Sequence, residues 1–239
     1  MSYKFALSGG LGDCIRQCFA HDGYSRLSTE SKSECIIHSH NPFSEELVKY
    51  HPAVLDGRCV ISKLPFATAN HALLPIAEPR IDKNPPIFFG ADAEKVRYLL
   101  PKEPYVILAP DAGDPCKGLP DHILLEAIGS YPVDAKLVLL GSTKISNASN
   151  VWRGDDSRLK NVLDLRNSLN VPETILAIRG DSRVYTAHSA INIIAWLYNI
   201  PQTVCVPRQL HYELYMTMMY RTNKEDYGMN HTFSRMILY

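Results

Sequence analysis

An excess of charge of one sign is missing from this sequence. Its 239 residues include 25 Lys and Arg against 25 Asp and Glu, so the formal net charge is zero. A chain without a net positive field has no general attraction for nucleic acid or for anionic membranes, although a local basic groove remains compatible with this balance. Internal repeats and low-complexity segments are missing as well. The composition therefore gives little support to a nucleic-acid or membrane-surface function.

Long apolar runs are also missing. No stretch reaches the roughly 18 uncharged apolar residues that a membrane-spanning helix needs. The N-terminal region has one lysine before a short apolar run that ends in glycines and Asp13. It lacks the long apolar core and the small-residue cleavage site of a signal peptide. We therefore expect a cytoplasmic protein without a transmembrane segment.

Closely spaced cysteines are missing too. The six cysteines are scattered without a C-x-x-C pair, at Cys14, Cys18, Cys35, Cys59, Cys116 and Cys205. In a cytoplasmic chain this pattern is typical of reduced thiols, so we expect no disulfide and no zinc. His38 and His40 would share one face of a strand, but structural zinc normally takes four ligands. We therefore predict no metal site.

The sequence does contain two strand–loop–helix units, and the first is at the N-terminus. An apolar run, Tyr3 to Leu7, leads into the glycine-rich stretch Ser8 to Asp13, and apolar residues then recur at helical spacing up to Ala20. Glycines let the backbone approach a ligand, and Asp13 in the first helical turn favours the positive end of the helix dipole. The alternative is that the glycines form only a tight turn and Asp13 only caps the helix.

This first unit does not match a dinucleotide-binding fingerprint well. Gly10 and Gly12 occupy the first two positions of G-x-G-x-x-G, but the third position falls on Ile15. The following strand ends in Ser39 and His40, where an acidic ribose ligand is expected. NAD binding is therefore only a minor alternative.

The second unit covers Arg183 to Pro201. A short apolar strand leads through a turn into a helix, and Ser189 stands where an N-cap belongs. The first backbone N–H groups of this helix predict a site for a phosphate or diphosphate; the alternative is only a capped helix. His188 is either a ligand or a satisfied turn histidine, and Asn192 either faces the ligand or caps locally.

Between residues 105 and 208, apolar strands alternate with helices. The predicted strands are Val106–Ala109, Leu137–Leu140, Val162–Leu165, Val184–Thr186 and Thr203–Val206, and the predicted helices between them lie near 120–129, 172–178 and 189–198. Two further helices are predicted outside this stretch, near 93–100 and 209–221. This alternation is typical of an α/β fold with a parallel sheet covered on both faces. Ligands bind beyond the carboxyl ends of such strands, so we expect the loops with Lys117, Ser142 and Ser189 to converge on one crevice. Residues 52–86 contain brief apolar runs at Cys59–Ile61 and Leu73–Ile76, which predict a few short strands and long loops on an acceptor-facing surface. Residues 223–239 show no clear period.

Three patches of the chain resemble one enzyme family. They are a Gly-Asp pair opening a helix, a strand and proline followed by a lysine, and a strand and helix that end in a proline. In order, they are Leu11, Gly12, Asp13 and Ile15; Tyr105 to Pro110 with Lys117; and Arg183 to Pro201, with Ser189 at the serine or threonine position of an Asp-Ser-Gly motif. On these patches the chain resembles the GT-B glycosyltransferases, most closely the heptosyltransferase-like group, glycosyltransferase family 9.

The chain departs from the family pattern in the third patch. The family's aspartate, glycine and later histidine fall on His188, Ala190 and Ile193. An alternative alignment places Asp181 and Ser182 on the motif. The chain is also shorter than a usual family member, mostly in its first domain. These departures bear on which donor is bound and leave the helix N-terminus intact.

The resemblance implies an α/β fold with two Rossmann-like domains of GT-B type facing each other across a cleft, the N-terminal one reduced. Residues 1–100 would form the acceptor-side domain and residues 105–208 the nucleotide-sugar-binding domain. Residues 209–239 would form a C-terminal helix and tail, with packing back on the first domain as one arrangement.

The resemblance also implies an inverting, metal-independent glycosyl transfer. Asp13 would be the catalytic base, and the donor diphosphate would be held by Gly10, Gly12, Lys117, Ser142, His188, Ser189 and Asn192. The nucleotide-sugar is the donor substrate, and no cofactor or metal is expected. The acceptor would be a saccharide or glycolipid, with a modified nucleic-acid base as the alternative. Two other functions remain: a nucleotide-sugar epimerase of the same fold, and a non-catalytic nucleotide-binding module.

Overall fold

The computed structural model describes residues 3–20, 23–39, 41–64, 87–113, 117–142, 157–179, 183–208 and 234–239. The chain forms two compact units, residues 1–91 and 92–239, which are described separately. Outside the described residues lie the apolar run at Leu73–Ile76, the predicted helix at 209–221, the alternative motif position at Asp181 and Ser182, and the side chains of His40 and Cys116.

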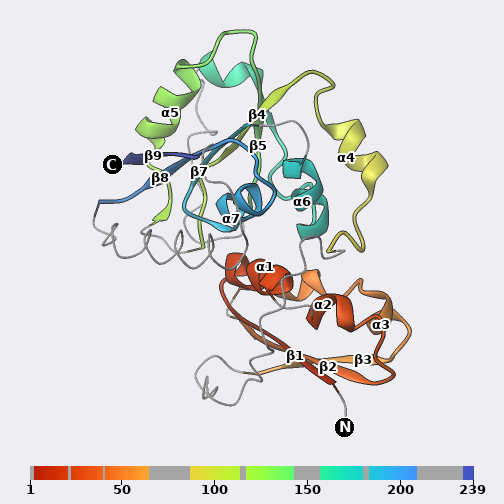
Figure 1. The fold of residues 1–239 in the computed structure, drawn as a ribbon. Helices are drawn as coiled ribbons and strands as arrows, with labels where there is room; N and C mark the ends of the chain where they lie inside the picture. Colours follow the sequence, from red (N-terminus) through yellow and green to blue (C-terminus); the bar gives the residue numbers. More distant parts are fainter. Residues whose placement is uncertain are drawn as a thin grey trace. The chain divides into compact units, whose positions relative to one another are not determined.

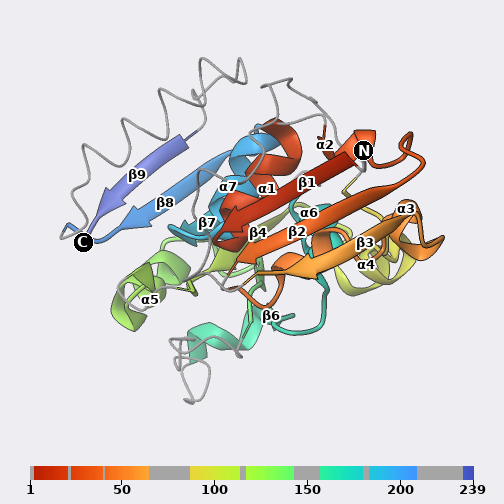
Figure 2. The same ribbon diagram turned by 90° about the horizontal axis from the view of Figure 1, so that it is seen from below.

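The first unit is built on three parallel strands in the order β1-β2-β3. The strands are β1 (Tyr3–Gly9), β2 (Ser33–Ser39) and β3 (Cys59–Lys63), and they run side by side in Figure 2. The helices are α1 (Leu11–Ala20), α2 (Gly23–Arg26), the 3-10 helix η1 (Ser44–Leu47) and α3 (Pro52–Leu55). Figure 1 shows α1, α2 and α3 on the same side of this sheet.

Period-two and period-four patterns produce the core of the first unit. Phe5 and Leu7 alternate along β1 and are buried, while Ile15 and Phe19, four residues apart on α1, are buried against them. Tyr24 adds a ring that packs edge-on to Phe5, and its hydroxyl donates to the carbonyl of Leu47 at 2.9 Å. The apolar face of α1 therefore fixes this helix beside the end of β1.

The second unit contains a six-stranded parallel sheet in the order β6-β5-β4-β7-β8-β9. The strands are β4 (Tyr105–Ala109), β5 (Lys136–Leu139), β6 (Val162–Asp164), β7 (Arg183–Ala187), β8 (Gln202–Val206) and β9 (Ser234–Leu238). The helices are α4 (Ala93–Leu99), α5 (Asp121–Gly129), the 3-10 helix η6 (Ser157–Asn161), α6 (Val171–Arg179) and α7 (Ala190–Leu197). The predicted α/β class with parallel sheets is confirmed, but β9 was not predicted.

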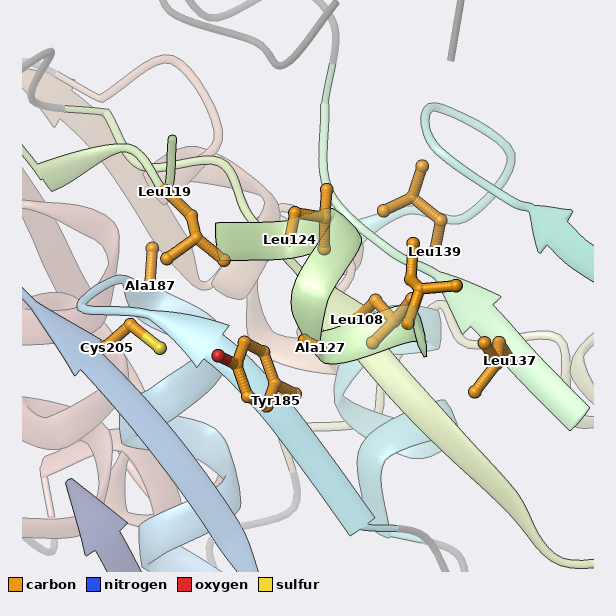
Figure 3. Close-up of a cluster of buried hydrophobic side chains, with 10 residues drawn as sticks. Leu108, Leu119, Leu124, Ala127, Leu137, Leu139, Tyr185, Ala187 and Cys205 are labelled. Carbon is orange, nitrogen blue, oxygen red and sulfur yellow. The ribbon is translucent and has the colours of Figure 1, made fainter. Parts of the chain in front are cut away.

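Helices cover both faces of the second sheet. On one face, α5 packs Leu124 and Ala127 onto a cluster that includes Leu108 and Leu139 (Figure 3). Figure 3 also shows the Tyr185 hydroxyl pointing toward the Cys205 sulfur. Burial, and then a hydrogen bond to Cys205, raise the pKa of Tyr185. The helices α6 and α7 lie on the other face (Figure 1).

A capping box starts α6 and joins it to α4. Asn170 Oδ1 accepts from the Glu173 N–H at 2.8 Å, and Glu173 Oε2 accepts from the Asn170 N–H at 2.9 Å. Lys95 on α4 pairs with the same Glu173 oxygen at 2.7 Å, and that carboxylate is 4% exposed. This ion pair links α4 to α6 within the second unit. The second unit begins at Asp92 and so includes α4, whereas the predicted first domain extended to residue 100.

Candidate functional site

The second sheet has a topological switch point between β4 and β7. Counted within this unit, the strand order is 3-2-1-4-5-6, and all the strand pairs are parallel. The chain leaves β4 toward α5 on one face and leaves β7 toward α7 on the other. In open α/β sheets, ligands bind outside the carboxyl ends of the strands at this point. Lys117 follows β4 and Ser189 follows β7, so both lie beyond the carboxyl ends of the two central strands.

The ends of the two central strands are joined by a buried hydroxyl. Thr186 Oγ1 lies 3.2 Å from the Ala109 carbonyl oxygen and 2.7 Å from the Ala187 carbonyl oxygen. The side chain of Thr186 is fully buried. Because Thr186 and Ala187 both lie on β7, the contact with the Ala109 carbonyl is the one that links β7 to the end of β4, and losing it would leave a buried carbonyl without this partner. The turns that follow β4 and β7 therefore start from a rigid edge.

Ser189 is the N-cap of α7, as predicted. Its backbone is extended, with φ −146° and ψ −175°, and its Oγ accepts from the Ile191 N–H at 3.3 Å. No acidic residue lies in the first turn of the helix. His188 before the cap and Asn192 within the first turn are both buried. Among the described residues, no group donates a hydrogen bond to Asn192 Oδ1, a buried atom.

The other end of α7 shows why the helix stops at this length. Asn199 has a positive φ of 55°, and its N–H donates to the Trp196 carbonyl at 3.1 Å. The Ile200 N–H donates to the Ala195 carbonyl at 2.8 Å, which completes a Schellman motif. Pro201 cannot continue a helix, so the chain turns into β8.

The loop after β4 returns to the end of its own strand. The Leu119 N–H donates to the Pro110 carbonyl at 2.8 Å, and Lys117, two residues earlier, is half-buried. Asp111 is 6% exposed, and its carboxylate lies beside Gly141 after β5. A Cβ at Gly141 would lie 3.3 Å from Asp111 Oδ2, and Gly141 has a φ of 141°. Asp111 was not predicted as a site residue, because its position beside Gly141 depends on a strand that is distant in sequence.

Ser142 contacts the loop after β6. Its Oγ donates to Asn167 Oδ1 at 3.0 Å, and the Asn167 N–H donates to the Gly141 carbonyl at 3.2 Å. Asn167 has a positive φ of 62°, which asparagine tolerates better than most residues. Ser142 therefore supports the loop after β5 at the same edge of the sheet.

Asp13 closes the start of α1 in the first unit. Gly10 is the N-cap, since its carbonyl accepts from the Cys14 N–H at 3.0 Å. Asp13 reaches back from the first turn, and its Oδ2 accepts from the Gly10 N–H at 3.0 Å. The other oxygen lies 3.4 Å from Arg16, and the side chain is about half exposed, at 51%. Gly12 lies between them in the first turn of the helix.

Gly9 allows this arrangement. Its φ is +84°, and a Cβ there would lie 2.7 Å from Asp13 Oδ2. An L-residue at this position would meet both backbone strain and a collision with the carboxylate. Glycine is therefore required to bring the end of β1 close to Asp13.

A hydrogen-bonded network supports the same turn and was not predicted. The Gln17 carboxamide pairs with Ser8, accepting from its N–H at 2.8 Å and donating to its carbonyl at 3.1 Å. Ser39 Oγ donates to the Gly9 carbonyl at 2.6 Å and lies 2.8 Å from Ser44 Oγ. Helical spacing marked the apolar face of α1, but it carried no signal for the partner of a polar residue such as Gln17.

The described residues contain no group of three or more His, Cys, Asp or Glu side chains that is arranged to hold a metal ion. His38 is fully buried. The cysteines at 14, 18, 35, 59 and 205 are buried free thiols. Burial raises the pKa of Cys18 and Cys35 well above the usual value. None of the helices that the structure describes is long and apolar enough to cross a membrane.

The second unit is a Rossmann-like parallel sheet with helices on both faces, and one solved structure shares the fold of the chain. ADP-heptose LPS heptosyltransferase II of E. coli matches 99% of this chain and 90% of its own length, with 14% identity and a TM-score of 0.54. The resemblance to heptosyltransferases is thus confirmed at the level of the fold. No protein-family model and no curated protein sequence matches the chain.

Two further structures show weaker similarity. The iron-containing dodecameric glycosyltransferase TibC of enterotoxigenic E. coli H10407 is 14% identical over 86% of this chain and 59% of its own length, with a TM-score of 0.44. A complex of TibC with ADP-D-beta-D-heptose covers 86% and 60%, with 14% identity and a TM-score of 0.38.

Proposed function

We propose that this protein is a glycosyltransferase of GT-B type that moves a sugar from a nucleotide-sugar to a hydroxyl acceptor by an inverting, metal-independent mechanism. One observation carries the proposal. A serine-capped helix without a first-turn acid begins at the switch point of a 3-2-1-4-5-6 sheet, in a chain that shares the fold of heptosyltransferase II.

The second unit would hold the donor diphosphate. The N-terminal turn of α7 presents backbone N–H groups and the positive end of the helix dipole, which suit an oxyanion. Ser189 caps this turn with a neutral hydroxyl and brings no negative charge to it. Lys117 would add a cation, and Ser142, His188 and Asn192 would add polar contacts. These donors would stabilise the charge that grows on the leaving diphosphate, where other enzymes use a magnesium ion.

The first unit would supply the base. Asp13 is half exposed, and the Gly10 N–H orients one of its oxygens. Its carboxylate would take the proton from the acceptor hydroxyl as that oxygen attacks the anomeric carbon. The bond from the anomeric carbon to the diphosphate oxygen breaks, and the configuration inverts. Gly10 and Gly12 were expected to contact the diphosphate, but Asp13 occupies the Gly10 N–H. In this proposal they therefore shape the turn beside the base, and the diphosphate contacts come from the second unit.

The donor is proposed to be an ADP-sugar. The support is the name of ADP-heptose LPS heptosyltransferase II, a protein that shares this fold. His188, which stands at the family's aspartate position, carries no carboxylate for the sugar hydroxyls. We therefore propose an ADP-sugar without assigning its sugar, and a saccharide or glycolipid acceptor.

A donor panel tests this function. The protein is incubated with ADP-, UDP- and GDP-sugars, with and without a saccharide acceptor, and nucleoside diphosphate release is measured. We expect acceptor-dependent release from an ADP-sugar, inverted anomeric configuration in the product and no loss of rate in EDTA. Product from the donor alone would indicate an epimerase, and binding without turnover would indicate a non-catalytic module. Absence of nucleoside diphosphate binding would overturn the proposal.

A further inference from the structure

A tyrosine far along the chain contacts the loop that carries Lys117. The hydroxyl of Tyr239 donates to the Gly118 carbonyl at 2.9 Å, across 121 positions of sequence. The ring also packs against the apolar cluster under α5. The carbonyl that receives this bond belongs to the residue directly after Lys117.

Tyr239 is itself held by the backbone of the neighbouring strand. Its N–H donates to the Val206 carbonyl at 3.3 Å, and its carbonyl accepts from the Arg208 N–H at 2.9 Å. These bonds continue the parallel pairing of β9 with β8. The backbone of Tyr239 is therefore fixed by its pairing with the chain that follows β8.

The Lys117 loop is thus fastened at two points. The Leu119 N–H is bonded to the Pro110 carbonyl at the end of β4, and the Gly118 carbonyl is bonded to Tyr239 beyond β9. Strands β4 and β9 lie at different positions in the same sheet, with β7 and β8 between them. Two ties from different strands restrict the backbone beside Lys117 more than either tie alone.

We propose that Tyr239 is a positioning residue that holds the Lys117 backbone so that the ammonium group is preorganised for the donor diphosphate. This inference rests on the proposed function of the Lys117 loop. Without the phenol, binding would have to order the loop as well as form the contacts, and this cost appears as lost affinity. Removing one such restraint is expected to weaken diphosphate binding by about 3- to 10-fold.

The second unit offers a matched control. The hydroxyl of Tyr105 also donates to a backbone carbonyl, that of Ala177, at 2.9 Å. Tyr105→Phe removes the same kind of bond from the same unit, but at the start of β4 and the end of α6. Both variants should lose similar stability, whereas only Tyr239→Phe should alter the loop at Lys117.

The test measures inorganic pyrophosphate binding by calorimetry in five proteins: the parent, Tyr239→Phe, Tyr105→Phe, Lys117→Ala and the double variant that combines Tyr239→Phe with Lys117→Ala. We expect weaker binding for Tyr239→Phe, parental binding for Tyr105→Phe, and no further loss in the double variant, because the phenol acts through the lysine. Equal affinities for the two phenylalanine variants would overturn the inference.

Amide hydrogen exchange without ligand gives an independent readout. Tyr239→Phe should speed exchange at residues 117–119, and Tyr105→Phe should not. If the parent bound no pyrophosphate, the proposed donor site would be wrong. The exchange rates would still test whether the bond from Tyr239 to the Gly118 carbonyl orders the loop. Faster exchange only in Tyr239→Phe would support it, and unchanged exchange would refute it.

Discussion

Helices α1 and α7 each follow directly from the end of a parallel strand, yet their first turns differ in charge. The N-cap of α1 is Gly10, and the Asp13 carboxylate occupies its N–H at 3.0 Å. The N-cap of α7 is Ser189, whose neutral hydroxyl accepts from Ile191 at 3.3 Å. One helix start carries its own anion, and the other has none in its first turn. The serine turn is therefore the better position for a bound phosphate, although the glycine-rich loop looks more like a cradle in sequence.

The residue before each cap differs in the same way. Gly9 precedes the α1 cap with a φ of +84°, next to Asp13. His188 precedes the α7 cap, and unlike Gly9 it has a side chain, which is buried. Gly9 of the first unit thus makes room for a carboxylate, whereas the start of α7 carries the polar side chains of His188, Ser189 and Asn192. This contrast suits a base in one unit and a leaving-group site in the other.

The largest expected effect is on turnover, from Asp13→Asn. The amide oxygen can still accept from the Gly10 N–H, so the helix start is preserved, but the group can no longer take a proton. We expect turnover to fall by about 100- to 10,000-fold with nucleoside diphosphate affinity unchanged. Asp92→Asn is the control, because Asp92 caps α4 by accepting from Lys95 N–H at 2.9 Å and should keep the parental rate. Parental turnover in Asp13→Asn would remove the base from the mechanism.

A charge placed at the serine turn makes α7 resemble α1. Asp is as good an N-cap as Ser, so Ser189→Asp should leave stability nearly unchanged. The added carboxylate should repel a bound diphosphate by about 3 kcal/mol at an effective dielectric of about 20, or about 100-fold in affinity. Ser189→Asn, a neutral cap, should bind nucleoside diphosphate like the parent. Calorimetry on both variants checks this, and tight binding by Ser189→Asp would place the anion elsewhere.

Gly9 both adopts a positive φ and leaves room for Asp13, and stability measurements can separate these two effects. Gly9→Ala combines a positive φ with a collision against Asp13, and we expect a loss of about 1–3 kcal/mol in the free energy of unfolding. Gly57→Ala is the control, since Gly57 has a φ of +78° with no atom within 4 Å of the added Cβ. Urea unfolding should show a smaller loss for the control. Equal losses would mean that contact with Asp13 does not require a glycine.

A smaller effect concerns pH and the unit that carries α1. His51 is fully buried between the rings of Tyr24 and Phe89, and its Nδ1 accepts from the Ala53 N–H at 3.1 Å. Burial lowers the pKa of His51. The unfolded chain then binds the proton at a higher pH than the folded chain does. The stability that the buried neutral imidazole contributes is fully present above the unfolded-state pKa of about 6.5, and it is lost as the pH falls below that pKa.

The variant His51→Asn tests this pH dependence, because asparagine can accept from the Ala53 N–H but does not titrate. Urea unfolding between pH 8 and pH 5 should show a steeper loss in the parent than in the variant. Parallel slopes would show that His51 contributes nothing to acid sensitivity.

Sequence patterns predicted the central features of the second unit and missed those that depend on distant partners. Buried apolar strands and Ser189 were visible because local periodicity and capping rules identify them. Strand β9 was not visible, since Ser234–Leu238 is short and follows no clear pattern. The ion pair between Lys95 and Glu173 joins residues 78 positions apart, and no local rule identifies such a partner.

In the first unit, the sequence left two roles for Asp13 open. The structure adds that Asp13 accepts from the Gly10 N–H, which is a capping contact, while its half-exposed side chain remains accessible. Helix α3 was not predicted, because Pro52–Leu55 is one turn long and has no periodicity to detect. Its start depends on His51, an unusual N-cap.

Amide chemical-shift mapping on the ¹⁵N-labelled protein, titrated with ADP, tests the central claim most directly. The account predicts that the shifts concentrate at Ala190 to Asn192 and at Lys117 and Gly118, while Gly10 to Asp13 change little. Saturable shifts at Gly10 to Asp13 with an unperturbed α7 would contradict it, because the diphosphate would then bind the helix that already carries a carboxylate.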